Sequence, residues 1–228
     1  ADALLRAVHQ EVLLRCQGDF WFWTSFVVTK DEADPAQSTK PFPRHLDYIH
    51  QYCDLMTTQK RIAVAKSRQM LVTWATCAYM CWVARFHPNA AVLYQTQSED
   101  DANGMVSAAG STKDGGYFGR CQFIERNLPV WMRQPIRDTE GMITYPNGSV
   151  TRALPGGANK IRGKPGTLIV LDEMAFLEEA KGSYTAIAPL VQKGAQLIAI
   201  STPNGGAGNF FYHLWHGLAL DAVTAAEA

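Results

Sequence analysis

Short apolar runs alternate with stretches of helical spacing along most of the chain. The short runs predict strands at 61–65, 91–95, 168–171 and 197–200. The stretches between them predict helices over 72–86, 98–109 and about 183–192. Pro88 stops the first of these helices, and Ser98 is a candidate N-cap for the second. Because strands and helices alternate, we expect an α/β fold, a mostly parallel sheet with helices on both faces.

The two ends of the chain follow other patterns. Residues 2–17 have helical spacing and precede an aromatic cluster, and residues 29–41 are polar and proline-containing, which predicts a loop. Apolar runs at 142–145 and 149–154 flank Pro-Asn-Gly, which predicts a hairpin. We therefore expect three parts. They are an N-terminal helical and aromatic segment (1–41), a core with a lid (42–216) and a tail or linker (217–228).

Composition limits the possible classes of protein. Hydrophobic residues make up 47% and charged residues 18%, which predicts an ordered core. Lys plus Arg and Asp plus Glu number 21 each, so any nucleic-acid surface has to be a local patch. The five cysteines form no CxxC pair, Cys77 and Cys81 suit buried thiols, and a reducing cytoplasm is expected. No apolar run approaches the roughly 20 residues that span a bilayer, so we expect no membrane association.

Two adjacent carboxylates, Asp172 and Glu173, follow the apolar run at 168–171. Four apolar residues in a row are typical of a strand that is buried on both faces, and open α/β sheets bind ligands at the carboxyl ends of such strands. In an NTPase the first carboxylate would hold Mg²⁺ and the second would polarise the attacking water. The alternative is the start of a helix over 174–180, where acidic residues are favourable.

A basic loop links the predicted strand 61–65 to the helix that begins at Val72. A strand, a tight loop and a helix N-terminus form a context that binds phosphate. The usual signature, GxxxxGK[ST], is matched poorly, because Leu71 and Val72 stand in place of glycine and lysine. Thr73 does fit as a hydroxyl that would ligate Mg²⁺. The alternative is an ordinary basic turn.

This loop nevertheless resembles a deviant form, K-S-R-Q-x-G-x-[ST], found in the ATPase domain of large terminase subunits, the motors that package DNA into viral capsids. Five residues match that form: Lys66, Ser67, Arg68, Gln69 and Thr73. The resemblance implies a RecA-like P-loop NTPase of the ASCE class that binds ATP and Mg²⁺, with Lys66 on the β- and γ-phosphates. Leu71 departs even from this form. If the position needs a left-handed backbone, leucine costs on the order of 1–2 kcal/mol relative to glycine.

Two further segments lie where the resemblance requires them. Asp172 and Glu173 match the family's Walker B pair, which implies a Mg²⁺ ligand and a water-activating base. Ser201, Thr202 and Asn204 lie in Ser-Thr-Pro-Asn-Gly, which is similar to the coupling motif that senses the γ-phosphate. The alternative for this second segment is a plain turn, because its composition favours one in any case.

Three more site residues come from weaker matches. Arg162 lies in an Ile-Arg-Gly segment that resembles the family's trans-acting arginine, which completes a neighbour's active site; the alternative is a solvated cationic loop. Phe42 and His45 lie in a segment similar to the family's adenine-recognition region, where a glutamine is more usual than His45. Phe42 is expected either to stack on the base or to join the core.

The resemblance implies a motor domain that hydrolyses ATP to drive double-stranded DNA into a procapsid, in the cytoplasm of an infected host cell. The implied partners are DNA, a portal protein, a small terminase subunit and further copies in a ring. Basic loops are the candidate DNA contacts, with Arg120, Arg126, Arg133 and Arg137. Only two acidic residues follow position 216, so no nuclease activity is expected. The alternatives are a helicase-like DNA translocase domain and a nucleotide-binding assembly module with little turnover.

Overall fold

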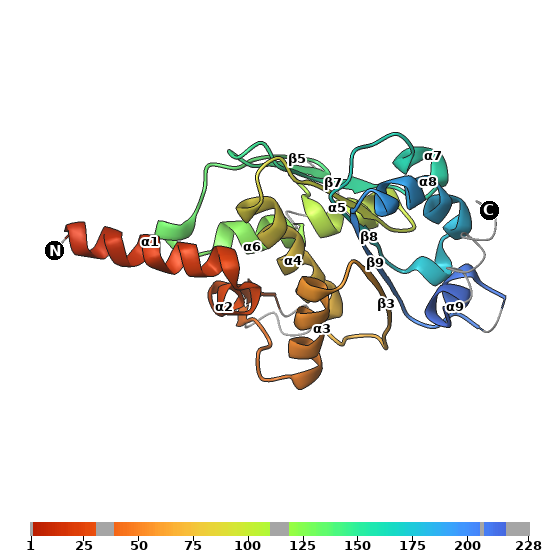
Figure 1. The fold of residues 1–228 in the computed structure, drawn as a ribbon, viewed down its shortest axis with the longest axis horizontal. Helices are drawn as coiled ribbons and strands as arrows, with labels where there is room; N and C mark the ends of the chain where they lie inside the picture. The colour runs from red at the N-terminus through yellow and green to blue at the C-terminus, as the bar shows by residue number, and fades with distance from the viewer. Residues whose placement is uncertain (1, 31–38, 110–118, 206–207, 218–228) are drawn as a thin grey trace.

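A seven-stranded sheet forms the centre of the molecule (Figure 1). The structure is a computed structural model that describes residues 2–30, 39–109, 119–205 and 208–217. The strands are β3 (Arg61–Ala65), β4 (Ala91–Gln95), β5 (Arg137–Thr139), β6 (Met142–Thr144), β7 (Val150–Leu154), β8 (Leu168–Leu171) and β9 (Gln196–Ser201). This arrangement confirms the α/β class. Three of the four strands first expected have their predicted bounds, and the fourth, β9, is longer by one residue at each end.

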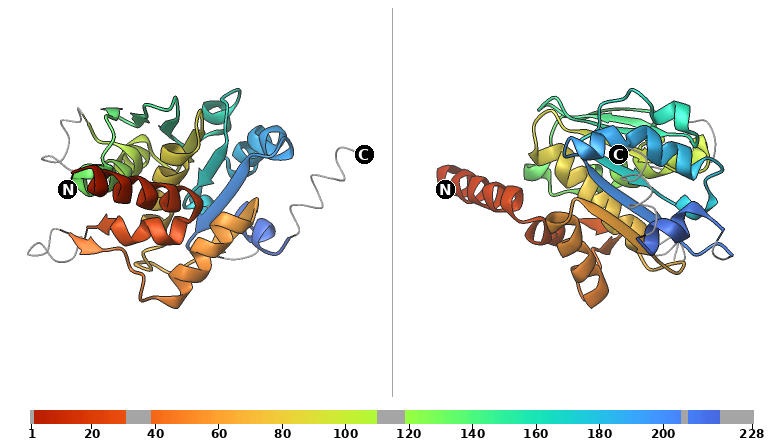
Figure 2. Two further views of the ribbon diagram at one scale, coloured as in Figure 1. Left: turned by 60° about the vertical axis from the view of Figure 1, so that its left-hand side comes forward. Right: turned by 45° about the vertical axis from the view of Figure 1, so that its right-hand side comes forward.

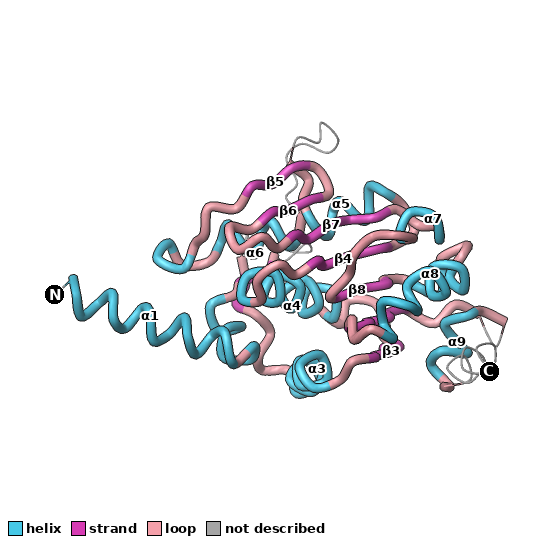
Figure 3. The backbone as a smooth tube through the Cα atoms, turned by 45° about the horizontal axis from the view of Figure 1, so that its top comes forward, coloured by secondary structure: helices cyan, strands magenta, loops and turns pink. Residues whose placement is uncertain are grey.

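The order of the strands is β3-β9-β8-β4-β7-β6-β5. Figure 3 shows the labelled strands in the reverse of this order from top to bottom, from β5 down to β3. The first five strands in this order, β3, β9, β8, β4 and β7, are parallel, whereas β6 and β5 pair antiparallel at one edge. Because β9 lies between β3 and β8, the carboxyl ends of these three strands are neighbours. In the register, Ala65 lies opposite Ser201 and Leu171 lies opposite Ala199.

Two apolar clusters cover the two faces of the sheet. The helices of the first cluster are α3 (Asp47–Thr58), α4 (Val72–Phe86), α5 (Glu99–Val106) and α6 (Arg120–Asn127). Those of the second are α7 (Ala158–Ile161), α8 (Ala180–Gln192) and α9 (Phe210–Trp215). Residues of β8 and β9 alternate between the clusters, as strands buried on both faces require. Figure 2 shows α8 on the opposite side of the sheet from α3 and α4.

The N-terminal segment packs on the outside of α4. It comprises α1 (Asp2–Gly18), α2 (Phe20–Trp23), the 3₁₀ turn η1 (Thr24–Phe26), and the short antiparallel pair β1 (Val28–Thr29) and β2 (Lys40–Pro41). Phe20 contacts the rings of Tyr79 and Trp82 on α4, and the indole of Trp82 donates to Cys16 O at 2.7 Å. The middle of α1 still contacts the body, because His9 stacks on Trp131, and only its N-terminal end extends away (Figure 1). The expected loop at 29–41 is described only at its two ends.

Several sequence expectations differ from the structure in detail. The helix expected over 98–109 begins after the cap at Ser98 but ends at Val106, where Ser107 is already extended. The helix expected from about 183 begins at Ala180. The five cysteines are all buried and free, as expected of buried thiols. Within the described ranges, no helix combines the length and the hydropathy needed to cross a bilayer.

Candidate functional site

Three strand ends meet at the carboxylate of Glu173. The Lys66 ammonium, just after β3, donates to Glu173 Oε1 at 2.8 Å. Thr202, just after β9, donates to Glu173 Oε2 through its hydroxyl at 3.0 Å and its backbone N–H at 3.2 Å. The sheet order explains this meeting, because β9 places Thr202 between the loop after β3 and the acidic end of β8. Residues 107 positions apart are thereby brought into direct contact.

Glu173 has an unfavourable backbone conformation and a partly exposed side chain. Its backbone is left-handed, with φ 47° and ψ 42°, a conformation that non-glycine residues adopt rarely. Its side chain is 31% exposed, whereas that of Lys66 is only 9% exposed. Burial acts to raise the pKa of Glu173, but the hydrogen bond and charge of Lys66 and the bonds from Thr202 lower it below its ordinary value. The carboxylate is therefore ionised at neutral pH and can accept protons.

Asp172 lies deeper than its neighbour. It is 3% exposed, its Oδ2 accepts a 2.6 Å hydrogen bond from the Tyr94 hydroxyl, and its Oδ1 accepts one from the Glu173 N–H at 2.8 Å. Burial raises the pKa of Asp172 above its ordinary value, although the Tyr94 hydrogen bond and the Lys66 charge oppose that rise. A buried carboxylate in this state gains from a nearby cation.

The loop between β3 and α4 is strained at two positions. Lys66 N–H extends the ladder by donating to Ser201 O at 3.0 Å, and residues 67–69 are exposed. Gln69 and Leu71 have φ values of 62° and 58°, which are left-handed. Leu71 therefore has the left-handed backbone that makes leucine less favourable than glycine at this position. Thr73 lies in the first turn of α4 and is partly exposed.

The turn after β9 is tied to the segment that follows Glu173. Ser201 is fully buried, and its hydroxyl donates to Thr202 O at 2.8 Å and accepts from Ala175 N–H at 3.0 Å. The Asn204 amide donates to Ala175 O at 3.2 Å. Ala175 belongs to the 3₁₀ turn η3 (Met174–Phe176), where the sequence also allowed a longer helix. These bonds join the two loops into one unit.

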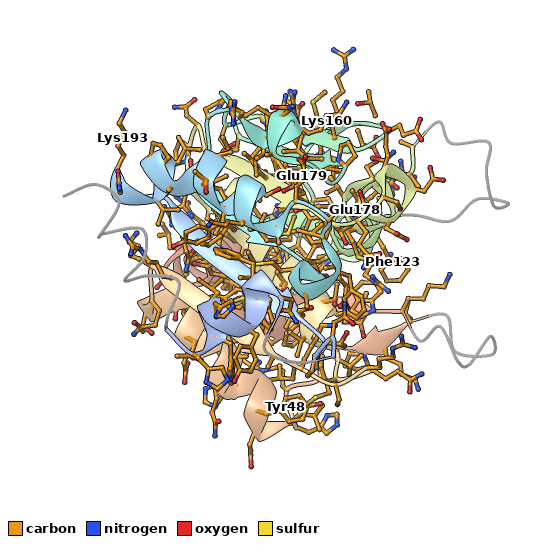
Figure 4. The ribbon with its side chains drawn as sticks, turned by 90° about the vertical axis from the view of Figure 1, so that its right-hand side faces the viewer. Tyr48, Phe123, Lys160, Glu178, Glu179 and Lys193 are labelled. Carbon is orange, nitrogen blue, oxygen red and sulfur yellow. The ribbon has the colours of Figure 1, made fainter. Side chains whose placement is uncertain are left out.

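Arg162 lies exposed at the end of the short helix α7, and it is not in the Lys66–Glu173 cluster. Two side chains fix the segment that carries it. The Glu179 carboxylate accepts from Ala158 N–H at 2.9 Å, and the buried Gln95 amide donates to Pro155 O and Gly157 O at 2.9 and 3.0 Å. Figure 4 shows Glu179 near Lys160, which belongs to α7.

Sequence reasoning missed three supporting residues: Tyr94, Gln95 and Glu179. Tyr94 and Gln95 end a predicted strand, and polar side chains at a strand end were the signal that could have marked them. Glu179 precedes α8 in a stretch with no distinctive spacing, and nothing in the sequence points to its contact with α7.

The remaining predicted residues lie in ordinary surroundings. Phe42 is 3% exposed and lies edge-on to Trp21, so it takes the core role, the second of the two expected for it. His45 is exposed. Of the arginines expected to contact DNA, Arg120 lies over the Trp74 ring, Arg126 pairs with Asp138 at 2.8 Å, Arg133 donates to Leu128 O at 2.7 Å, and Arg137 is exposed.

The oxygen atoms that the site offers as metal ligands suit magnesium better than a metal ion whose ligands all come from the protein. Among the described residues, no group of three or more His, Cys, Asp or Glu side chains could cage a metal ion. Mg²⁺ is usually bound by one or two carboxylates together with substrate phosphates and water. The Asp172 carboxylate and the Thr73 hydroxyl provide oxygen donors of the required kind, so these residues fit the ion.

The fold and site together define a class. A mostly parallel sheet, a basic strand-to-helix loop and an acidic pair at a nearby strand end are the arrangement of nucleotide-binding α/β domains. No family model matches the sequence.

Solved structures specify the fold further. The ATPase domain of the Thermus phage P74-26 large terminase matches with a TM-score of 0.51 and 21% identity, over 68% of this chain and 64% of that one. The HK97 bacteriophage large terminase matches with a TM-score of 0.57 and 12% identity, over 86% of this chain and 39% of that one. Each match therefore spans less than two thirds of the terminase chain. The protein has the fold of a phage large terminase ATPase domain, as the sequence resemblance implied.

Proposed function

We propose that the chain is the ATP-hydrolysing motor domain of a viral large terminase subunit, which drives double-stranded DNA into a procapsid. The observation that carries this proposal is the convergence of Lys66, Glu173 and Thr202 at one point. A basic loop, an acidic strand end and a hydroxyl-bearing turn are the parts that phosphoryl transfer to water needs. The fold shared with phage terminase ATPase domains supports the same assignment.

Lys66 is the phosphate-binding cation in this proposal. Its ammonium is 2.8 Å from Glu173 and would leave that carboxylate to bind the β- and γ-phosphates of ATP. Backbone N–H groups of residues 67–72 and the N-terminus of α4 add further donors. Ser67, Arg68 and Gln69 lie exposed around this position.

Glu173 is the proposed general base. The carboxylate is ionised, and because the Lys66 contact lowers its pKa, moving Lys66 to the phosphates would make Glu173 a better acceptor of a proton from the water that attacks the γ-phosphate. Thr202 holds one carboxylate oxygen in place through two hydrogen bonds while Lys66 turns toward the phosphates. Thr73 and Asp172 would hold Mg²⁺, which when bound offsets negative charge on the phosphates.

The turn that contains Ser201, Thr202 and Asn204 is the proposed coupling element. It contacts Glu173 on one side and η3 on the other, so a change at the γ-phosphate reaches both. Arg162 is exposed at the surface of the domain, where a neighbouring subunit of a ring can receive it. Portal protein, small terminase subunit and DNA are the proposed partners, and the host cytoplasm is the proposed location.

ATP turnover in purified protein tests the proposal. We expect low turnover by the isolated wild type, because Arg162 acts only when another subunit presents it. We expect loss of both binding and hydrolysis in Lys66→Ala, because the phosphates lose their cation. Lys60→Ala is the matched control, since Lys60 is exposed just before the opposite end of β3. If Lys66→Ala binds and hydrolyses ATP as well as Lys60→Ala does, the proposal is wrong.

One observation favours a second candidate, a nucleotide-binding assembly module with little turnover. Lys66 and Glu173 neutralise each other, and the loop holds two residues in left-handed conformations. If ATP cannot separate the ion pair, nucleotide binds without hydrolysis. Equal, near-zero turnover by wild type and Glu173→Gln in assembled rings, with ATP binding intact in both, would favour this module.

A further inference from the structure

An apolar hollow of about 160 Å³ adjoins the Lys66–Glu173–Thr202 cluster. Ala65 and Pro203 form its sheet side. Phe211, Tyr212 and Trp215 form its α9 side, and Asn204 and Asn209 complete the lining. Ala65 immediately precedes Lys66, and Pro203 immediately follows Thr202. The two residues on the sheet side of the hollow are therefore sequence neighbours of Lys66 and Thr202, which both contact Glu173.

The dimensions of the hollow suit a single ring system. Pockets that enclose a whole drug-sized ligand measure roughly 300–1,000 Å³, and this hollow is about 160 Å³. Two aromatic side chains of its lining are exposed, Tyr212 at 36% and Trp215 at 48%. They lie three residues apart on α9 and therefore on the same side of the helix. Exposed aromatic rings that border a small apolar hollow are suited to stacking on a flat ligand.

The polar side chains of the lining already serve to hold its walls. Asn209 caps α9 by accepting from Tyr212 N–H at 2.8 Å, and its amide donates to Asn204 O at 2.8 Å. The Asn204 amide in turn donates to Ala175 O. These bonds fix α9 against the turn after β9, so the hollow is preformed. They also leave stacking, rather than hydrogen bonding, as the main means of recognition.

We propose that this hollow is the nucleobase subsite of the nucleotide whose phosphates meet Lys66. The base stacks on Tyr212 and Trp215, and the site accepts different purines with little discrimination, because stacking is available to any base. This inference rests on the proposed function, since it assumes a triphosphate at Lys66. It places the base at α9 instead of at Phe42, whose ring is buried.

Calorimetric binding of ATP, GTP and inorganic tripolyphosphate tests the subsite, because tripolyphosphate has no base. Tyr212→Ala and Trp215→Ala should each weaken ATP and GTP binding on the order of ten-fold and leave tripolyphosphate binding unchanged. Tyr212→Phe should bind ATP like the wild type, which shows that the ring matters and that the fold is intact. Tyr48→Ala, on the different helix α3 and labelled in Figure 4, is the matched control for removing an exposed tyrosine.

Three results would overturn the inference. Wild-type ATP affinity in both alanine variants, together with lost ATP and tripolyphosphate binding in Lys66→Ala, would keep the phosphate site and reject the base subsite. Equal weakening of ATP and tripolyphosphate in Tyr212→Ala would also reject it, because the loss would not involve the base. If the wild type binds none of the three ligands, both the subsite and the proposed function fail.

Discussion

Lys66 and Glu173 form an ion pair of 2.8 Å between the loop after β3 and the end of β8. This ion pair has to break if Lys66 is to bind phosphate and Glu173 is to activate water. The contact leaves the two principal charges of the site neutralised. On the proposed function, a ligand that carries several negative charges would compete with Glu173 for the same ammonium.

Glu173→Gln should separate binding from hydrolysis. Removing the negative charge frees Lys66, so ATP affinity should be retained or rise, whereas turnover should fall by roughly 10²–10⁴-fold because the general base is lost. Binding is measured by calorimetry and turnover by phosphate release. Glu178→Gln, an exposed acid five positions on and labelled in Figure 4, should match the wild type in both. Full turnover by Glu173→Gln would rule out the assigned base.

Thr202→Val should lower turnover while leaving ATP affinity nearly unchanged. Valine cannot donate the 3.0 Å hydrogen bond to Glu173 Oε2, so the carboxylate loses one of its two fixed contacts from this residue. We expect kcat to fall about ten-fold or more with little change in KM, because the affected interaction orients the base. Thr185→Val is the control, since its hydroxyl bonds only within α8, to Lys181 O. A change confined to KM would contradict this role.

Asp172→Asn should stabilise the fold at neutral and alkaline pH. Asparagine keeps both contacts, because its oxygen accepts from Glu173 N–H and its amide donates to the Tyr94 hydroxyl, and it removes a buried charge. The raised pKa of Asp172 means that the folded state binds this proton more tightly than the unfolded chain does. Wild-type stability therefore falls as pH rises from the ordinary toward the raised pKa, and stays lower above it.

Urea unfolding in metal-free buffer measures this effect. At pH 8 the variant should exceed the wild type in unfolding free energy. The difference should shrink as the pH falls and the wild-type carboxyl takes up its proton. A variant less stable than the wild type at pH 8 would show that the ionised carboxylate is net stabilising.

Gln69→Gly should raise the unfolding free energy by on the order of 0.5 kcal/mol. Glycine adopts the φ of 62° without the penalty that glutamine incurs, and this gain exceeds the added entropy of the unfolded chain. Gln69 is exposed, so little packing is lost. Arg68→Gly is the matched control. Because Arg68 is outside the positive-φ set, this substitution should destabilise the protein. Equal destabilisation by both substitutions would argue against strain at position 69.

Arg162→Ala and Glu173→Gln should complement each other in mixed assemblies. Each variant alone should be inactive in rings, but a mixture places an intact Arg162 from one subunit beside an intact Glu173 of another. Phosphate release from the mixture should therefore exceed that of either variant alone. Lys164→Ala, which removes a nearby cation, should behave like the wild type. Active rings of Arg162→Ala would exclude a trans-acting role.

Periodicity predicted the central elements well, because apolar runs at 61–65, 72–86, 91–95 and 168–171 are bounded by clear polar or proline signals. It missed α3, although Ile49, Tyr52, Cys53 and Met56 are buried at helical spacing. The resemblance to terminase ATPase motifs implied that Lys66 and Glu173 act on the same phosphate, and the structure brings these two side chains together at the carboxyl ends of neighbouring strands.

Other features depend on contacts that a single sequence does not encode. The left-handed backbone at Gln69 and Leu71 is unusual for these residue types, and composition argues against it. Glu179 acts on α7 from 21 positions away, through a contact that only the folded chain creates. The aromatic pair on α9 has the spacing of ordinary core residues, and only its exposure distinguishes it.

β9 is buried at every one of its six positions, and it is clamped between β3 and β8. Such a strand cannot shift without disrupting its pairing with both neighbours, so it is a rigid part of the sheet. On the proposed function, any displacement caused by chemistry at Glu173 would have to be taken up beyond Ser201, where the chain leaves the sheet. The turn there is bonded to Glu173 through Thr202 and to the cap of α9 through Asn204 O, so the turn and the helix would move together.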